Sequence, residues 1–264
     1  MLGGFFMFLV LNKNKIASYI IALSTVIILF CVASVMMTYQ EEAIETSGYA
    51  NRQLPIYNVK MEEKKIALTI NCAWTADDID IILKTLEKHQ SKITFFMVGT
   101  WIEKYPEEVK KIAAAGHEIA NHSETHPHVN QLSYEKNVEE IKKCNDRIKA
   151  LTGNDVKLYR GPYGEYNDTV IKAAKSLNMQ VIQWNIDSLD YKGLTGKEML
   201  SRINEKLSSG SIILMHSGAK YTGETLDMIL TGIKSQGYEI VKVSDIIYQH
   251  NFTIDNNGTQ IKIK

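Results

Sequence analysis

Two histidines four residues apart are the first residues in this sequence whose types and spacing could do chemistry. His122 and His126 belong to the segment HSETH, which directly follows a predicted β-strand at residues 118–121. Imidazole nitrogens are common ligands of divalent metal ions, and a four-residue spacing places both rings on one side of a helical turn. Such a pair is more often surface decoration than a ligand set, so the spacing alone does not decide. Its position at the end of a strand favours a metal site.

Three further motifs end predicted strands in the same way. They are Arg160–Gly164 (RGPYG), Trp184–Tyr191 (WNIDSLDY) and the segment LMH that ends at His216. Chemistry collects at the carboxyl ends of strands in barrels of alternating strands and helices, so all three motifs can face one pocket. A structural interpretation stays open for each: the RGPYG turn could serve the fold alone, and Asp187 and Asp190 could be ordinary loop acids.

The scaffold behind these motifs is predicted by an alternation of strand and helix patterns. This order is typical of βαβ units and a parallel sheet. Roughly seven units over about 190 residues predict an α/β fold, a distorted (β/α)7-type barrel. The predicted strands are 65–71, 92–98, 118–121, 156–159, 180–184, 211–215 and 238–242, and the predicted helices are 77–89, 106–115, 134–152, 169–177, 197–207 and 224–236.

In their order, these motifs resemble those of the NodB-homology polysaccharide deacetylases, carbohydrate esterase family four. The family's ordered motifs are TFDDG, HxxxH, RxPYG, DxxDW and LxH. The second, third and fifth are intact here, and the fourth has Tyr191 in place of tryptophan. The resemblance runs from about Lys64 to Gln249 and implies an N-acetylated polysaccharide as substrate. An altered first motif followed by tryptophan is similar to the subgroup associated with sporulation and the spore cortex.

The resemblance implies a role for each matching residue. The two histidines of the HSETH segment would ligate a divalent metal ion, commonly zinc, which polarises the acetamide carbonyl and holds the attacking water. His216 would be the general acid, and Asp190 would orient its ring. The backbone N–H of Tyr163 would stabilise the oxyanion, and Arg160 would order the base or the acetate product.

The first motif departs from the family pattern. Where the family has two aspartates, a general base and a metal ligand, this chain has Asn71 and Cys72. An amide has no useful basicity, and losing a positioned base costs on the order of 10²–10⁴ in rate. A thiolate is a good zinc ligand, so a site of two histidines and Cys72 is one expectation, and a buried, inert cysteine is the other. Three accounts of the missing base stay open: Asp77 or Asp78 substitutes for it, His216 serves as base and acid in turn, or the domain is weak or inactive.

Charge and cysteine content exclude two classes of protein. Thirty Lys and Arg residues balance thirty Asp and Glu residues, so no global field recruits nucleic acid and we expect no nucleic-acid partner. The three cysteines are scattered, so a disulfide framework is not expected, although a single Cys72–Cys144 bridge stays open.

An uncharged apolar run, residues 16–37, predicts a transmembrane helix or signal anchor. Lysines precede it and acidic residues follow, which places residues 1–15 in the cytoplasm and the rest of the chain outside the membrane. A cleaved signal peptide is the competing interpretation, but the run is long and no A-x-A site follows. Residues 38–63 are then a linker, residues 64–250 the deacetylase-like domain, and residues 251–264 a C-terminal hairpin with Asn-Gly at its turn.

Together these features predict a membrane-anchored, metal-dependent hydrolase on the outer face of the cytoplasmic membrane. It would remove N-acetyl groups from a cell-wall or surface polysaccharide such as peptidoglycan, with activity reduced by Asn71. The alternative is a non-catalytic module of the cell wall that binds metal and glycan in the same cleft. A third expectation is an esterase that removes O-acetyl groups, which requires less protonation of the leaving group.

Overall fold

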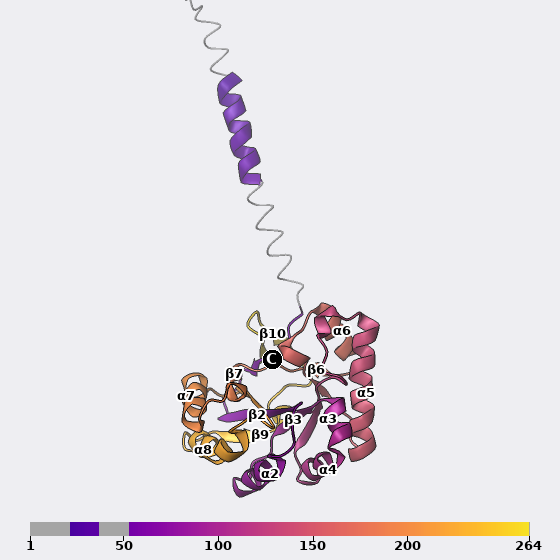
Figure 1. Ribbon diagram of the computed structural model, residues 1–264. Coiled ribbons are helices and arrows are strands. Elements are labelled where there is room, and N and C mark those ends of the chain that lie inside the picture. Colours follow the sequence, from indigo (N-terminus) through magenta and orange to yellow (C-terminus); the bar gives the residue numbers. More distant parts are fainter. Residues whose placement is uncertain (1–21, 37–52, 264) are drawn as a thin grey trace, which may run out of the picture. The chain divides into compact units, whose positions relative to one another are not determined.

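The computed structural model describes residues 22–36 and 53–263, which belong to two compact units divided between Arg52 and Gln53 (Figure 1). The described part of the first unit is one helix, residues 22–36, with apolar side chains such as Leu23 and Phe30 exposed. None of the helices in the described ranges combines the length and the apolar character that crossing a membrane requires. The predicted span over residues 16–37 extends past this helix at both ends. Those extensions, and the predicted cytoplasmic segment, lie outside the described residues.

A parallel sheet forms the centre of the second unit. Its strands follow the order β6-β5-β4-β3-β2-β8-β7, with β9 also paired to β2, and every pair is parallel. The predicted parallel α/β architecture is therefore confirmed, in the form of a half-barrel whose end strands β6 and β7 do not pair. The strands are β2 (Lys65–Cys72), β3 (Thr94–Met97), β4 (Glu118–Asn121), β5 (Leu158–Tyr159), β6 (Gln180–Val181), β7 (Ile186–Asp187), β8 (Ile212–His216) and β9 (Glu239–Val241).

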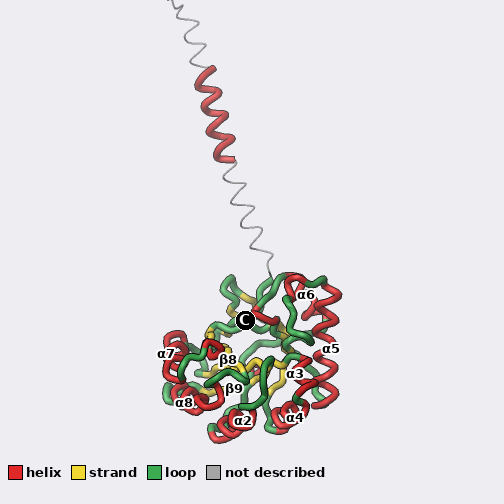
Figure 2. Tube along the Cα trace, in the orientation of Figure 1, coloured by secondary structure: helices red, strands yellow, loops and turns green. Residues whose placement is uncertain are grey.

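Helices surround this sheet on its outer side (Figure 2). Their ends follow from local sequence: Ser133 accepts a hydrogen bond from Lys136 N at the start of α5, and Gly153 ends that helix with a φ of 74°. Thr195 and Glu198 form a reciprocal capping box at the start of α7. The helices are α2 (Ile79–Lys88), α3 (Gly99–Lys104), α4 (Pro106–Ala114), α5 (Tyr134–Thr152), α6 (Asp168–Ser176), α7 (Gly196–Lys206) and α8 (Thr222–Lys234).

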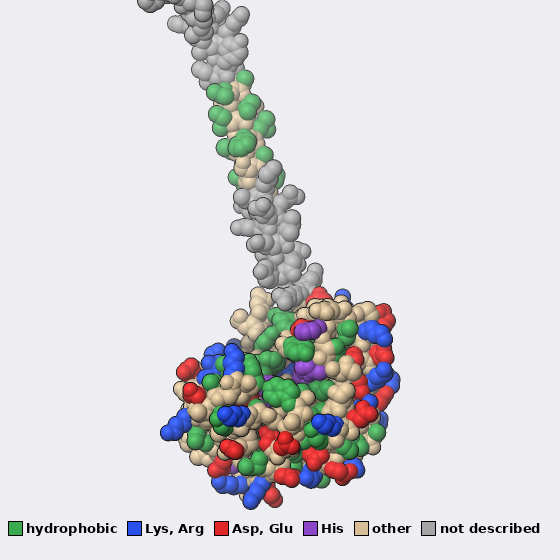
Figure 3. Space-filling view, in the orientation of Figure 1, with side chains coloured by type: hydrophobic (Ala, Val, Ile, Leu, Met, Phe, Trp, Pro, Cys, Tyr) green, Lys and Arg blue, Asp and Glu red, His purple; other side chains and the backbone are tan. Residues whose placement is uncertain are grey.

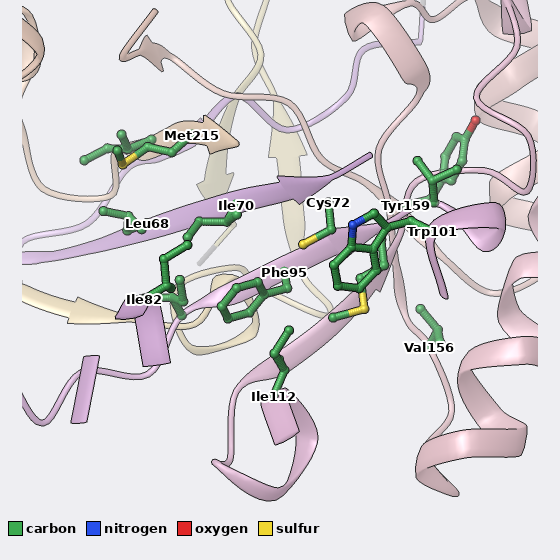
Figure 4. Packing of buried hydrophobic residues seen from close by; sticks show 14 of the residues in the cluster. Leu68, Ile70, Cys72, Ile82, Phe95, Trp101, Ile112, Val156, Tyr159 and Met215 are labelled. Carbon is green, nitrogen blue, oxygen red and sulfur yellow. The ribbon is translucent and has the colours of Figure 1, made fainter. Parts of the chain in front are cut away.

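Strand β2 separates two apolar clusters, because successive side chains of a strand point to opposite faces. Ile66, Leu68 and Ile70 pack outward against the helices. Ala67 belongs to the cluster on the inner side of the half-barrel, and Thr69 and Asn71 have the same parity. Figure 4 shows the outer cluster, with Ile70 beside residues of the neighbouring strand and helices. The parity of β2 therefore decides which side chains can reach the inside.

The open seam of the half-barrel is bridged by residues near the start of the second unit. Ile56 forms a parallel bridge with Ile182, and Asn58 forms an antiparallel bridge with Ser211. Strand β1 (Asn58–Val59) then pairs with β11 (Thr259–Lys262), which forms the C-terminal hairpin with β10 (Phe252–Ile254). The structure thus contains the predicted hairpin and its Asn-Gly turn. The compact unit begins at Gln53, so residues 53–63, predicted as linker, pack with the domain.

Candidate functional site

A cleft of about 550 Å³ opens at the carboxyl ends of the sheet strands. Figure 3 shows histidine side chains and hydrophobic side chains gathered on one face of this domain. The common position follows from the parallel sheet, because all its strands end at the same edge. Of the eight residues given a catalytic or metal-binding role in the sequence analysis, five line the cleft: Asn71, His122, His126, Tyr163 and His216.

The HSETH segment is a loop and not the helical turn that its spacing suggested. His122 follows β4 directly, and both Ser123 (φ 71°) and His126 (φ 59°) adopt left-handed backbone conformations. The chain therefore turns sharply between the two histidines. The turn still brings the rings together, with centroids 5.0 Å apart. The expectation of adjacent imidazoles is met by a different backbone geometry from the one predicted.

A carboxylate that sequence reasoning missed holds this loop. Glu140 of α5 accepts hydrogen bonds from the Ser123 hydroxyl at 2.7 Å and from the backbone N–H of Thr125 at 2.9 Å. Asn121 Oδ1 accepts a third bond from the backbone N–H of Ser123 at 2.7 Å. These bonds satisfy polar groups that the sharp turn leaves without helix or sheet partners.

The position of Glu140 on its helix could have indicated from the sequence that its side chain faces the domain. It lies three residues after Asn137 and four residues before Cys144, both of which are buried. Residues at these spacings share one face of a helix, so a carboxylate here faces the domain. Such a carboxylate needs buried donors, and the loop supplies them.

Hydrogen bonds fix the state of the His122 ring. Nδ1 lies 2.8 Å from the carbonyl oxygen of Arg160, which can only accept, so Nδ1 carries the proton and donates. Nε2 then keeps its lone pair, and the Asn71 side-chain nitrogen lies 3.2 Å from it. The Asn71 amide therefore donates to the lone pair that a metal ion would use. Burial, with a smaller contribution from His126, lowers the pKa of His122 well below its ordinary value and keeps the ring neutral.

The Asn71 amide has a second partner, the buried guanidinium of Arg160. Nη1 of Arg160 donates to Asn71 Oδ1 at 2.8 Å and to Thr69 Oγ1 at 3.0 Å. The other nitrogens donate to the carbonyl oxygens of Ile182 and Gln183. Arg160 is fully buried and forms no ion pair with a described carboxylate, and burial lowers its pKa to about 9. Asn71 thus bridges a buried cation and a neutral imidazole.

His216 and Asp190 form the partnership that the sequence predicted. The ring Nδ1 lies 2.9 Å from Asp190 Oδ1, and the backbone N–H of His216 donates to Oδ2 at 2.6 Å. Thr222 also donates to Oδ2, at 2.7 Å. Trp74 stacks on the His216 ring, with centroids 5.1 Å apart and an interplanar angle of 22°. The imidazole is therefore held in one orientation at the cleft wall.

Tyr163 of the RGPYG turn stands at the rim of the cleft. Its φ is 58°, an uncommon value for a residue other than glycine, and its side chain is 61% exposed. The ring contacts the His126 ring edge-on at 4.6 Å and stacks on His128 at 4.4 Å. The oxyanion role of its backbone N–H stays a prediction.

Cys72 lies on the other side of the sheet from the histidines. It is the neighbour of Asn71 on β2, so its side chain points outward, where it is fully buried among Ile70, Phe95 and Trp101 (Figure 4). Burial raises the pKa of its thiol to about 12, which disfavours the thiolate that binds metal. Cys72 and Cys144 are both free thiols. The structure therefore does not bring Cys72 together with the histidine pair.

These donors do not fit a divalent metal ion held by the protein. Zinc sites use at least three protein ligands. Here Asn71 occupies the lone pair of His122, and the thiol proposed as third ligand faces the apolar cluster. Among the described residues, no three His, Cys, Asp or Glu side chains lie close enough to hold one ion. The expected site of two histidines and Cys72 is corrected on this point.

The structure also locates the acids considered as substitute bases. Asp78 Oδ1 accepts a hydrogen bond from the backbone N–H of Gly218 at 3.0 Å. Burial raises the pKa of the Asp78 carboxyl to about 6. Neither Asp77 nor Asp78 lines the cleft. Asp187 does line it, and there it accepts a hydrogen bond from the Tyr191 hydroxyl at 3.2 Å.

Comparison with known proteins agrees with the fold and the motif order. A model of the polysaccharide deacetylase family matches residues 58–182. The solved structure of BA3943 from Bacillus anthracis is 35% identical, has a TM-score of 0.71 and covers 74% of this chain and 69% of that chain. The chain belongs to the polysaccharide deacetylase family. This is the NodB-homology family, carbohydrate esterase family 4. BA3943 is a pseudoenzyme of this family, and one of its mutants has restored enzymatic activity.

Curated relatives include both enzymes and uncharacterised proteins. The peptidoglycan-N-acetylglucosamine deacetylase of Bacillus cereus is 33% identical over 181 residues, which are 67% of this chain and 66% of the relative. YlxY of Bacillus subtilis, described as uncharacterised, is 33% identical over 193 residues, 73% of this chain and 60% of the relative. The chain thus spans 60–66% of the length of these two relatives.

Proposed function

We propose that this polysaccharide deacetylase homologue binds N-acetylated glycan chains of peptidoglycan in its cleft without hydrolysing them. The observation that carries the proposal is the Asn71 amide, which donates to His122 Nε2 and accepts from Arg160. A deacetylase needs a base at this point of the cleft and a histidine lone pair free for metal. One neutral side chain here removes both.

The cost to hydrolysis follows from the chemistry of the amide. Asn71 cannot accept a proton from water, and loss of a positioned base lowers a rate by roughly 10²–10⁴. Activation of water by a metal could offset part of this loss, but the donor set does not fit a metal ion. The contribution of a general base and the contribution of a metal-activated water to the rate of hydrolysis are therefore both reduced.

Binding is supported by the aromatic side chains around the cleft. Trp74, Tyr163 and Tyr191 line it and are 47%, 61% and 44% exposed. Exposed rings of this kind stack on the apolar faces of sugars and offer polar edges to hydroxyl groups. Trp184 also lines the cleft, although it is less exposed. The relatives named as peptidoglycan deacetylases support peptidoglycan as the glycan.

A second candidate function is slow hydrolysis, and the intact His216–Asp190 pair favours it. An imidazole held by a carboxylate at 2.9 Å is suited to donate a proton to a leaving amine. Under this hypothesis His216 would serve as base and acid in turn. Only a measured turnover would distinguish it from pure binding.

The test measures binding and hydrolysis on the same preparation of the full chain. Calorimetry with N-acetylated glycan tetrasaccharides reports binding, and acetate release with and without added zinc reports hydrolysis. We expect saturable binding and no acetate above the level of a His122→Ala variant. Acetate release that chelator abolishes and His216→Ala removes would instead establish the hydrolase.

Asn71→Asp is the matched variant. It restores a carboxylate and leaves His122 Nε2 without its amide donor, so we expect zinc binding and acetate release to rise above the wild-type level. If the variant binds no more zinc and releases no more acetate than the wild type, Asn71 is not the cause of the missing activity. The proposal would then lose its main support.

We also propose that residues 16–37 anchor the chain in the cytoplasmic membrane and that the domain acts outside it. The support is the uncharged run with lysines before it and acidic residues after it. Protease added to intact protoplasts should remove the domain and leave a membrane-bound fragment. A domain that is protected until the cells are lysed would contradict this arrangement.

A further inference from the structure

A second cavity, of about 530 Å³, adjoins the cleft. Trp74 and Tyr191 line both cavities, so a ligand that stacks on either ring in the cleft can extend into the second one. Both rings also pack on His216, with centroid distances of 5.1 Å for Trp74 and 5.4 Å for Tyr191. His216 therefore stands at the boundary between the two cavities.

Two lysines give the second cavity its charge. Lys192 ends the short 3-10 helix Asp190–Lys192, and Lys220 lies in the loop between β8 and α8. Both are exposed, and neither forms an ion pair with a carboxylate in the described part of the chain. A hydrogen bond with the Tyr221 side chain raises the pKa of Lys220, so this amine is charged at neutral pH.

The acid that lines this cavity does not neutralise the lysines. Asp190 is 1% exposed, and its two oxygens accept from His216, Thr222 and the backbone N–H of Tyr191. Its charge is directed toward these donors. Both lysines therefore line the cavity without a carboxylate partner in the described part of the chain, so a ligand can neutralise their charge.

We propose that the second cavity binds a carboxylate carried by the same glycan that lies in the cleft. The inference rests on the proposed function and narrows its ligand to an acidic glycan. Two ammonium groups without a carboxylate partner among the described residues gain a charge-assisted contact from a carboxylate, which a neutral sugar cannot provide. In peptidoglycan, such a carboxylate comes either from the lactyl ether of N-acetylmuramic acid or from the stem peptide.

Three tetrasaccharide probes distinguish these sources. One is neutral chitotetraose, the second alternates N-acetylglucosamine with peptide-free N-acetylmuramic acid, and the third carries stem peptides on the same sugars. Calorimetry with the full chain gives an affinity for each. We expect an acidic probe to bind about tenfold more tightly than chitotetraose, because two exposed charge contacts each contribute modestly. Preference for the peptide-free acidic probe identifies the lactyl carboxylate, and preference for the peptide-bearing probe alone identifies the peptide.

The variant Lys192→Gln/Lys220→Gln tests the site. It should reduce the affinity for the acidic probe to that for chitotetraose and leave chitotetraose binding unchanged. The matched control is Lys84→Gln/Lys197→Gln, which removes two exposed lysines of α2 and α7 that line neither cavity. The control should keep the preference for the acidic glycan.

The outcomes separate this inference from the proposed function. Equal affinity for neutral and acidic probes overturns the carboxylate site and leaves glycan binding intact. A preference that survives in Lys192→Gln/Lys220→Gln also overturns it. If no probe binds, both proposals are wrong.

Discussion

Replacing Asn71 by alanine should destabilise the domain by about 3 kcal/mol, because one amide satisfies two buried groups. The amide oxygen accepts from Arg160 at 2.8 Å, and the amide nitrogen donates to His122 at 3.2 Å. Arg160 is fully buried, and its Nη1 would keep only Thr69 as a side-chain acceptor. The variant thus leaves a buried cation short of a partner.

The magnitude follows from the two bonds. A hydrogen bond to a charged group contributes about 1.5–3 kcal/mol, and a bond between neutral groups contributes about 1 kcal/mol. Asn71 and His122 both line the cleft, so water can replace part of the neutral bond. The expected loss is therefore about 2–4 kcal/mol, most of it from the guanidinium.

Urea unfolding of the full chain, followed by tryptophan fluorescence, measures this loss. The matched control is Asn185→Ala. Asn185 also makes two side-chain hydrogen bonds, to Ser211 Oγ and from the backbone N–H of Ile212, but neither partner is charged. We expect the control to lose about 1–2 kcal/mol, because Asn185 is half-buried and water can replace part of its two neutral bonds. If Asn71→Ala loses no more than the control, the bridge between Arg160 and His122 does not exist as described.

Three further predictions concern other parts of the domain. Cys72→Asp should lower the free energy of unfolding by more than about 3 kcal/mol in urea titrations, because it buries an unpaired carboxylate. Cys72→Val is the control and should be tolerated. Equal effects of the two substitutions would contradict the outward orientation of Cys72. Glu140→Gln should weaken glycan binding in calorimetry by about tenfold, because a neutral amide oxygen is a weaker acceptor for the donors of the HSETH loop. Unchanged affinity would refute the role of Glu140 in holding this loop in place. Burial lowers the pKa of His117 from 6.5 to about 4. Between these two pH values the unfolded chain binds more protons than the folded chain. The free energy of unfolding should therefore fall by up to about 3 kcal/mol as the pH drops through this range. Unfolding measured at pH 7 and pH 4.5 checks this, and His117→Gln should flatten the dependence.

Strand parity explains both what the sequence predicted and one of its failures. The run of residues 65–71 was expected as a strand, and β2 covers Lys65–Cys72. Ending the strand at Asn71 left the direction of Cys72 open. One more residue of strand sends Cys72 to the face opposite Asn71, because successive side chains alternate. The thiol then has the same parity as Leu68 and Ile70, whose apolar character already marked that face as core.

Convergence of the motifs was predictable, while the details of the HSETH loop were not. His122, Arg160 and His216 were expected to face one pocket, because parallel strands end at one edge, and their segments do meet there. The left-handed conformation of Ser123 occurs in a loop whose partners are supplied by Glu140 of α5, which lies later in the sequence. A spacing of four residues contains no information about those partners. Hydrogen bonds to Glu140, a residue distant in sequence, stabilise the backbone conformation of this loop.

The pairing of β1 with the C-terminal strand β11 has a consequence for the order of folding. Asn58 pairs with Thr259, about two hundred residues later, and contacts of such separation form slowly because a long loop must close first. The parallel sheet can assemble from its own strands as they emerge from the ribosome, but β1 gains its partner only when β11 has been made. We therefore expect a nascent intermediate in which β1 lacks its partner strand. A ribosome-bound chain that stops before Thr259 should be cleaved by protease near residues 53–59, and release of the last strand should protect them.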